Sequence, residues 1–262
     1  MALITVCSHR LEYQRIEITR ADRPTLVFLH EGLGSLAMWK DFPGDLAHAT
    51  NCNAIVYSRY GYGNSDPLVG PRDVRYMHDE ALVALPELMD RLAIERPILV
   101  GHSDGASIAI VYAGGSGRAV AALVLMAPHV LVEDISVESI AAAKAAYQTT
   151  DLRTKLARYH ADVDSAFRGW NDIWLHPDFR RWNIEEYLPR IGCPVLAMQG
   201  QDDEYGTMDQ LERIARQAPD VELLELADCR HSPHRDQPEA VIEAVRRFVD
   251  RIIAAGRAKP DA

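Results

Sequence analysis

The sequence has few cysteines, and none is spaced as metal or redox sites require. Its four cysteines lie far apart, and no two of them form a C-x-x-C motif: Cys7, Cys52, Cys193 and Cys229. Isolated thiols of this kind are typical of reduced, packed cysteines in a cytoplasmic protein. The ten histidines also lack the His-x-x-x-His spacing of a helical metal site. We therefore expect a cytoplasmic protein without a metal site.

The sequence also lacks an excess of positive charge and any long apolar run. It has 28 Lys and Arg against 38 Asp and Glu, a formal net charge of −10, which disfavours binding to nucleic-acid phosphates. No apolar run approaches the roughly 18 residues of a membrane-spanning helix, and no basic segment followed by an apolar one stands at the N-terminus. We expect no nucleic-acid partner, no membrane span and no secretion.

Short β-branched runs alternate with stretches of helical periodicity along most of the 262 residues. Strands are predicted at 11–18 (one arm of an antiparallel pair), 25–30, 53–58, 97–100, 120–126, 194–199 and 221–226. Helices are predicted at 73–92, 106–113, 207–218 and 236–254. Such alternation predicts an α/β fold with a mostly parallel sheet that is covered on both faces.

Residues 129–190 interrupt this alternation, with helix-forming stretches, no convincing strand and three of the four tryptophans. A helical insertion after a strand lies over the edge at which open α/β sheets bind ligands. We expect Trp170, Trp174 and Tyr147 to line a pocket for a small-molecule substrate with an apolar or aromatic portion. The alternative is that such rings form only the core of the segment itself.

The motif Gly101-His102-Ser103-Asp104-Gly105 lies between a predicted strand and a predicted helix. A serine on such a sharp turn is exposed above the sheet, at the positive end of the following helix, as a nucleophile needs. A serine nucleophile also requires a base that an acid orients. Asp202 and Asp203 follow the strand 194–199, while His231 and His234 follow the strand 221–226. By chemistry alone, either carboxylate and either histidine qualifies.

With these motifs, and with His30-Glu31-Gly32-Leu33-Gly34-Ser35, the chain resembles the α/β-hydrolase superfamily over about residues 11–253. The resemblance implies the α/β-hydrolase fold, with a mostly parallel eight-stranded sheet flanked by helices. It also implies a core domain of residues 1–128 and 191–262. A helical cap (lid), residues 129–190, would be inserted after the sixth strand.

The resemblance further implies the roles of individual residues. It selects Asp203 as the acid and His231 as the base for Ser103. The backbone N–H groups of Asp104 and of either Gly32 or Leu33 would form the oxyanion hole. The alignment does not decide between Gly32 and Leu33 as the second donor. Arg230 stands where the family often has glycine.

The implied function is that of a serine esterase, which cleaves a carboxylic ester through an acyl-enzyme and needs no cofactor. Alternatives are a C–C bond hydrolase of ring-fission (meta-cleavage-like) products, a thioesterase or acyltransferase, and a ligand receptor with a vestigial triad. The oligomeric state stays open, a homodimer being one alternative. Two alternatives are open for the acidic side chains of Glu31 and Asp104. Either they turn away from the pocket and bond to nearby backbone or to Arg59, or they place negative charge near the pocket and disfavour anionic substrates.

Overall fold

The computed structural model describes residues 1–18 and 23–257, whose eight strands form one sheet in the order β1-β2-β4-β3-β5-β6-β7-β8. The strands are β1 Ala2–Val6, β2 His9–Ile16, β3 Leu26–Leu29, β4 Ala54–Tyr57, β5 Ile98–His102, β6 Ala122–Met126, β7 Val195–Gly200 and β8 Val221–Leu226. Strands β1 and β2 form an antiparallel pair, and β2 also runs antiparallel to β4. All other neighbours are parallel. The predicted α/β fold with a mostly parallel eight-stranded sheet is therefore confirmed.

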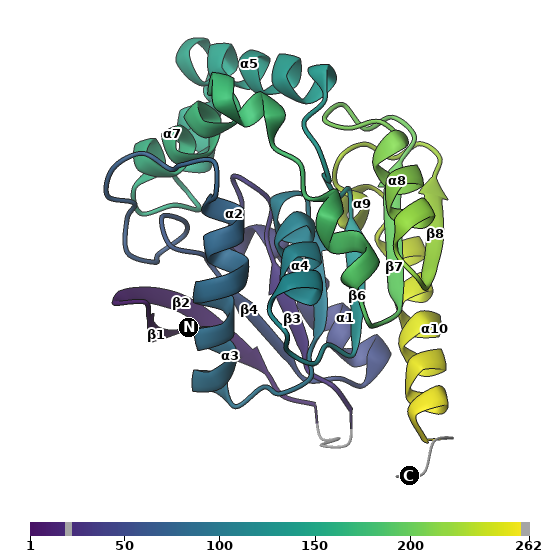
Figure 1. The fold of residues 1–262 in the computed structure, drawn as a ribbon. Coiled ribbons are helices and arrows are strands. Elements are labelled where there is room, and N and C mark those ends of the chain that lie inside the picture. The colour runs from purple at the N-terminus through teal and green to yellow at the C-terminus, as the bar shows by residue number, and fades with distance from the viewer. Residues whose placement is uncertain (19–22, 258–262) are drawn as a thin grey trace.

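Helices cover both faces of this sheet (Figure 1). They are η1 Leu36–Trp39, α1 Phe42–Thr50, α2 Tyr76–Asp79, η2 Glu80–Ala84, α3 Leu85–Leu92, α4 Asp104–Gly115, α5 Asp134–Thr149, α6 Leu152–Leu156, α7 Val163–Trp174, η3 Pro177–Arg181, η4 Glu185–Arg190, α8 Asp209–Gln217, α9 Pro233–Asp236 and α10 Pro238–Arg257. No helix within 1–18 and 23–257 is both long enough and apolar enough to cross a membrane.

Neighbouring residues of the central strands enter two different cores, because successive side chains of a strand point to opposite faces. Val27 and Leu29 pack into the core that α3, α4 and α8 cover. Leu26 and Phe28 pack into the core beneath α1 and α10. These four residues are fully buried, as the continuous apolar run of a central parallel strand predicts.

The predicted helix at 73–92 exists, but it begins at Tyr76 and contains the π-helical turn η2. Pro86 follows this turn and has no N–H to donate to the preceding turn of the helix. The regular hydrogen-bond ladder of the helix is therefore interrupted at this point, where both a π turn and a proline stand.

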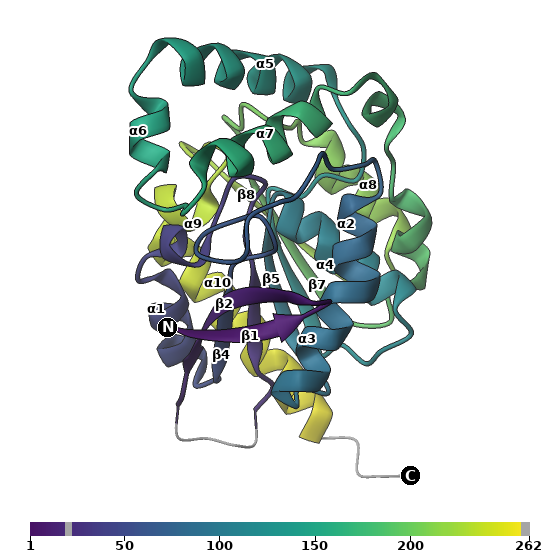
Figure 2. The same ribbon diagram turned by 90° about the vertical axis from the view of Figure 1, so that its left-hand side faces the viewer.

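The segment 127–194 between β6 and β7, called the helical segment below, carries α5, α6, α7, η3 and η4. Figures 1 and 2 show α5 and α7 together on one side of the sheet, beyond the ends of its strands. Its only strand-like pairing in the described part of the chain is an isolated bridge between Leu131 and Asn183. The division of residues 129–190 from the rest as a cap domain stays a prediction.

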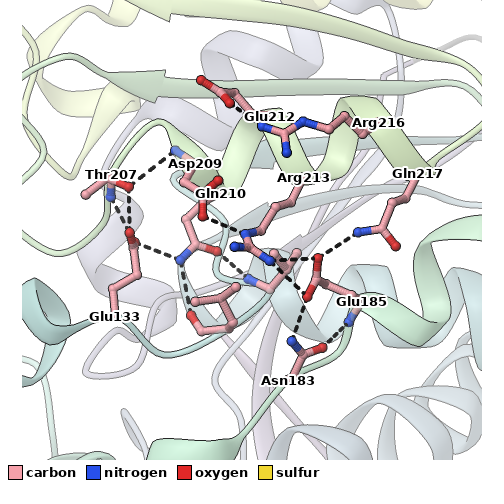
Figure 3. A network of polar contacts seen from close by, with 12 residues as sticks. Glu133, Asn183, Glu185, Thr207, Asp209, Gln210, Glu212, Arg213, Arg216 and Gln217 are labelled. Carbon is pink, nitrogen blue, oxygen red and sulfur yellow. Dashed lines mark hydrogen bonds and ion pairs between the residues drawn. The ribbon is translucent and has the colours of Figure 1, made fainter.

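A network of polar contacts fastens both ends of the helical segment to α8 and the loop before it (Figure 3). The Glu133 carboxylate accepts hydrogen bonds from the Thr207 N–H at 2.9 Å and from Gln210 Nε2 at 2.8 Å. The Glu185 carboxylate accepts one from Arg213 Nη1 at 3.2 Å. These contacts hold the helical segment in place beside the loop that follows β7.

Candidate active site

Ser103 lies on a strained turn between β5 and α4, with φ 54° and ψ −119°. A positive φ is uncommon in residues other than glycine because it is energetically unfavourable, and it persists only where the surrounding structure enforces it. A Cβ on Gly105 would lie 1.9 Å from the Leu29 carbonyl oxygen, and one on Gly101 would lie 2.5 Å from the Gly105 oxygen. Both glycines are therefore required by the close approach of β3, β5 and α4 around the serine.

Ser103, His231 and Asp203 form one chain of hydrogen bonds. His231 Nε2 lies 3.0 Å from Ser103 Oγ, and His231 Nδ1 lies 2.8 Å from Asp203 Oδ1. Asp203 is buried, whereas Asp202 is exposed. His234 packs against Trp39, with 4.8 Å between ring centroids. The structure thus brings Asp203 and His231, and not their sequence neighbours, to Ser103.

Two backbone contacts hold the loops of this acid and this histidine together. The Asp202 N–H donates to the Cys229 carbonyl at 3.0 Å, and the Gln201 N–H donates to the Leu226 carbonyl at 2.9 Å. A Cβ on Gly200 would lie 2.0 Å from the Cys229 oxygen, so only glycine permits this approach. The register of the parallel strands β7 and β8 therefore fixes the position of Asp203 relative to His231.

Asp203 and His231 shift each other's pKa. Burial lowers the pKa of His231, but the charge and hydrogen bond of Asp203, with Glu204 adding to them, raise it above its usual value. Burial raises the pKa of Asp203, but the His231 ring and the N–H of Tyr205, at 2.8 Å, lower it overall. An ionised carboxylate thus supports an imidazole that can take a proton from Ser103.

Arg59 holds the loop that follows β3. Its Nη2 donates to the Glu31 carbonyl at 2.8 Å and to the His30 carbonyl at 3.2 Å. In a trans peptide the C=O and the next N–H point in opposite directions, so this contact turns the Gly32 N–H away from Arg59. Gly32 and Leu33 both border the cavity that contains Ser103. The choice between them as an oxyanion donor stays open.

The Asp104 carboxylate turns away from Ser103, toward the helices. It accepts hydrogen bonds from the Tyr76 hydroxyl at 2.6 Å and from Trp174 Nε1 at 3.2 Å. Arg59 Nη2 lies 3.9 Å from it, so the buried negative charge is balanced. The backbone N–H of Asp104 is at the start of α4, where helical N–H groups have no partner in the helix.

The cavity at Ser103 has a volume of about 140 Å³. Its wall comes from the loops after β3, β5, β6, β7 and β8 and from α5 and α7: Glu31, Gly32, Leu33, His102, Ser103, His129, Ser136, Ile140, Trp170, Trp174, Tyr205, His231 and Ser232. Trp170 and Trp174 border this cavity, and their contact with a substrate stays a prediction.

Tyr147 does not border this cavity. It stacks on Phe167, with 3.7 Å between ring centroids, and donates a hydrogen bond to Asp164 at 2.6 Å. Ile140, on the same helix, does border the cavity. Tyr147 stands seven residues farther along, which is about 10 Å at 1.5 Å per helical residue. This distance carries Tyr147 past the cavity, contrary to the expectation from sequence.

The model of the Alpha/beta hydrolase family matches residues 26–244 of this chain. The chain belongs to the alpha/beta hydrolase family. This hydrolase is 22% identical to a proline iminopeptidase of Saccharolobus solfataricus, with 94% of this chain and 91% of the relative covered. It is 27% identical to a putative carbamate hydrolase, RutD, of Caulobacter sp., with 87% and 91% covered.

Solved structures share the fold of this hydrolase. A thermophilic esterase from Thermogutta terrifontis has a TM-score of 0.73 at 19% identity, with 96% of this chain and 98% of that one covered. An enol-lactonase from Burkholderia xenovorans has a TM-score of 0.75 at 20% identity, with 95% and 100% covered. The family model that matches residues 26–244 confirms the predicted resemblance to this superfamily, and these structures share its fold.

Several residues of this hydrolase site were not among the site residues predicted from sequence, and Arg59, His129 and Tyr205 matter most for its geometry. Arg59 is the only side chain in residues 1–18 and 23–257 that donates to both carbonyls ahead of Gly32. His129 and Tyr205 border the cavity beside His231. The glycines that follow Arg59 in the sequence indicate a turn at its position, whereas no sequence motif marks His129 or Tyr205. Across the same residues, no group of three or more His, Cys, Asp or Glu is arranged to hold a metal ion.

Proposed function

We propose that this hydrolase cleaves a carboxylic ester through an acyl-enzyme on Ser103. The observation that carries the proposal is the hydrogen-bonded chain from Ser103 through His231 to Asp203, with 3.0 and 2.8 Å between the heavy atoms. This is the arrangement by which a serine is activated as a nucleophile.

In the first half of the reaction, His231 Nε2 accepts the Ser103 proton while Oγ attacks the ester carbonyl. Asp203 keeps the proton on Nδ1 and stabilises the imidazolium. The imidazolium then donates its proton to the leaving alcohol as the C–O bond breaks. In the second half, His231 Nε2 accepts a proton from a water molecule as the water oxygen attacks the acyl carbon. It then donates this proton to Ser103 Oγ as the bond between Oγ and the acyl carbon breaks.

The developing oxyanion receives hydrogen bonds from the backbone N–H of Asp104 and from that of Gly32 or Leu33. Each such donor contributes on the order of 3 kcal/mol to stabilising the transition state. We further propose that residues 129–190 act as a cap, because α5 and α7 supply Ile140, Trp170 and Trp174 to the cavity wall.

A fluorophosphonate probe, which reacts with activated serines, tests the nucleophile. We expect the wild-type protein to be labelled and the Ser103→Ala variant to stay unlabelled. Ser116→Ala, a serine at the far end of α4, is the matched control and should label as the wild type does. A folded wild-type chain that does not label would support the receptor alternative instead.

A substrate panel tests the bond that is cleaved. It contains p-nitrophenyl esters of rising chain length, a thioester, a proline anilide, a carbamate and a ring-fission dienoate. The amide and the carbamate are included because the relatives named above are a proline iminopeptidase and a putative carbamate hydrolase. We expect the short esters to be cleaved fastest. If a compound of another class were turned over faster, that class would be the substrate and the proposed ester specificity would be wrong.

A further inference from the structure

The cavity at Ser103 limits the size of the group that it encloses. Its volume of about 140 Å³ is below the roughly 300–1,000 Å³ of pockets for drug-sized ligands. An apolar cavity of about 150 Å³ takes up one benzene molecule. The enclosed part of a substrate is therefore no larger than about one aromatic ring.

One part of the cavity wall is apolar and lies at the loop after β3. Trp170 packs so closely on Gly32 that a Cβ there would lie 2.2 Å from its Cδ1 atom. Leu33 and Ile140 also border the cavity. An apolar acyl group would pack against this part of the wall and be removed from water there.

Another part of the wall surrounds His231 and is polar. The His129 ring centroid lies 5.7 Å from that of His231, and the Tyr205 ring centroid lies 4.7 Å from it. In ester hydrolysis by this site, His231 protonates the leaving alcohol, so that alcohol lies beside His231. His129 and Tyr205 are then among its polar neighbours, together with His102, whose Nδ1 lies 3.5 Å from the Glu31 carboxylate.

His129 has hydrogen-bonding capacity that the protein leaves unused. It is 3% exposed, and its buried Nδ1 atom has no partner. Throughout residues 1–18 and 23–257, neither ring nitrogen of His129 forms a hydrogen bond, nor does the Tyr205 hydroxyl. Buried polar groups are normally paired, so an unpaired one at a cavity indicates a ligand group that completes it.

Both rings are held in place, which a binding site requires. The His129 ring packs edge-on against Trp174 with 5.2 Å between ring centroids. The backbone carbonyl of His129 accepts a hydrogen bond from Ser107 Oγ at 2.6 Å. The Tyr205 ring packs against the His231 ring with 4.7 Å between centroids, and the Tyr205 backbone carbonyl accepts from Ser136 Oγ at 2.5 Å. Binding of a substrate to these rings therefore costs little conformational entropy, because the rings are already ordered.

The charges at this wall favour a neutral partner. Burial, with the nearby His231 ring adding to it, lowers the pKa of His129 to about 3, so its imidazole is neutral at physiological pH. A neutral imidazole offers one donor and one acceptor, which matches a hydroxyl group. The Glu31 side chain, 22% exposed, also borders the cavity and opposes a carboxylate.

We propose that His129, with Tyr205 beside it, binds a hydroxyl group on the leaving alcohol. The substrate class is then an ester of a small apolar acid, up to about one aromatic ring, with an alcohol that carries a second hydroxyl. This inference rests on the ester hydrolysis proposed above.

Two esters of equal size test the inference: 2-hydroxyethyl benzoate and propyl benzoate differ only in a hydroxyl that replaces a methyl group. We expect the wild-type kcat/KM to be about 10- to 100-fold higher for the hydroxyethyl ester, the range that one or two buried hydrogen bonds supply. His129→Phe should bring the ratio close to one. His129→Asn, which keeps a donor and an acceptor, should retain part of it, and Tyr205→Phe should lower it.

His78→Phe is the matched control, because His78 is a buried histidine that contacts Tyr187 and does not border the cavity. This variant should keep the wild-type ratio. Equal kcat/KM values for the two esters in the wild type would overturn the inference while leaving ester hydrolysis in place. So would a ratio that survives in His129→Phe.

Binding without turnover separates this inference from the proposed function. The Ser103→Ala variant cannot form the acyl-enzyme, and Trp170 and Trp174 at the cavity report binding by fluorescence. We expect this variant to bind the hydroxyethyl ester more tightly than the propyl ester, and to lose the preference when His129→Phe is added. Equal affinities would contradict the inference even if no ester were cleaved.

Discussion

Trp174 Nε1 donates a hydrogen bond to the Asp104 carboxylate over 3.2 Å, so the helical segment is bonded directly to the residue that follows Ser103. The same indole lies 3.1 Å from the Tyr76 hydroxyl, which also donates to Asp104. The cavity wall formed by Trp174 and the turn that presents Ser103 are therefore positioned by one buried carboxylate.

Replacing this carboxylate should destabilise the protein, because buried polar groups on three other elements depend on it. Asp104→Ala removes the acceptor of the Tyr76 hydroxyl and of the Trp174 indole and leaves the buried Arg59 without its counter-charge. Breaking a buried charge pair costs about 3–5 kcal/mol. Asp104→Asn keeps one acceptor oxygen and should cost less. Urea unfolding measures both. Free energies of unfolding within about 1 kcal/mol of the wild type for both variants would contradict this role.

Arg59→Lys should lower kcat while changing KM little. Lysine keeps the positive charge but replaces the rigid, planar guanidinium, whose Nη2 donates to both the His30 and Glu31 carbonyls, by an ammonium group on a flexible chain. Misplacing an oxyanion donor slightly costs about 10- to 100-fold in rate. The measurement is steady-state kinetics with a neutral ester.

The control for this variant is Arg23→Lys, since Arg23 also donates to a backbone carbonyl, that of Thr50 at 2.7 Å, outside the cavity. It should have wild-type kinetics. If both substitutions reduced kcat alike, the effect would reflect general destabilisation and not the loop after β3.

The pH dependence of kcat/KM should have its acid limb above the usual histidine pKa of about 6.5. His231 must be neutral to accept the Ser103 proton, and Asp203 and Glu204 raise its pKa by stabilising the imidazolium. Glu204→Gln removes one negative charge, so the pKa falls and activity extends to lower pH. Asp202→Asn, an exposed neighbour, should leave the midpoint in place. A midpoint that rises in Glu204→Gln would refute the assigned cause.

The sequence predicts those site residues whose positions follow from strand ends. Ser103, Asp203 and His231 each come just after a strand of a parallel sheet, and the carboxyl ends of such strands meet at one edge. His129 also follows a strand, but its importance depends on packing against Trp174, which lies far along the chain. Tyr147 has a residue type that suits an apolar pocket, but only the structure shows how far along α5 it lies.

Gly32→Ala should reduce activity because a methyl group has no room at this position. The added Cβ would lie 2.2 Å from Trp170 Cδ1 and 3.2 Å from Asp104 Oδ2. Trp170 cannot retreat freely, since Phe167 packs edge-on against it with 5.9 Å between centroids. The loop after β3 must therefore shift, and a shift of about 1 Å costs on the order of 100-fold in kcat/KM.

The double variant Gly32→Ala, Trp170→Leu relieves the clash and should regain part of the lost activity, measured with a short-chain ester. Gly44→Ala is the control, because nothing lies within 4 Å of the added Cβ there. It should keep wild-type activity and a stability equal to or slightly above that of the wild type, since alanine reduces the freedom of the unfolded chain. Wild-type kinetics in Gly32→Ala alone would show that the loop tolerates displacement, and the oxyanion donor would then have to be sought elsewhere.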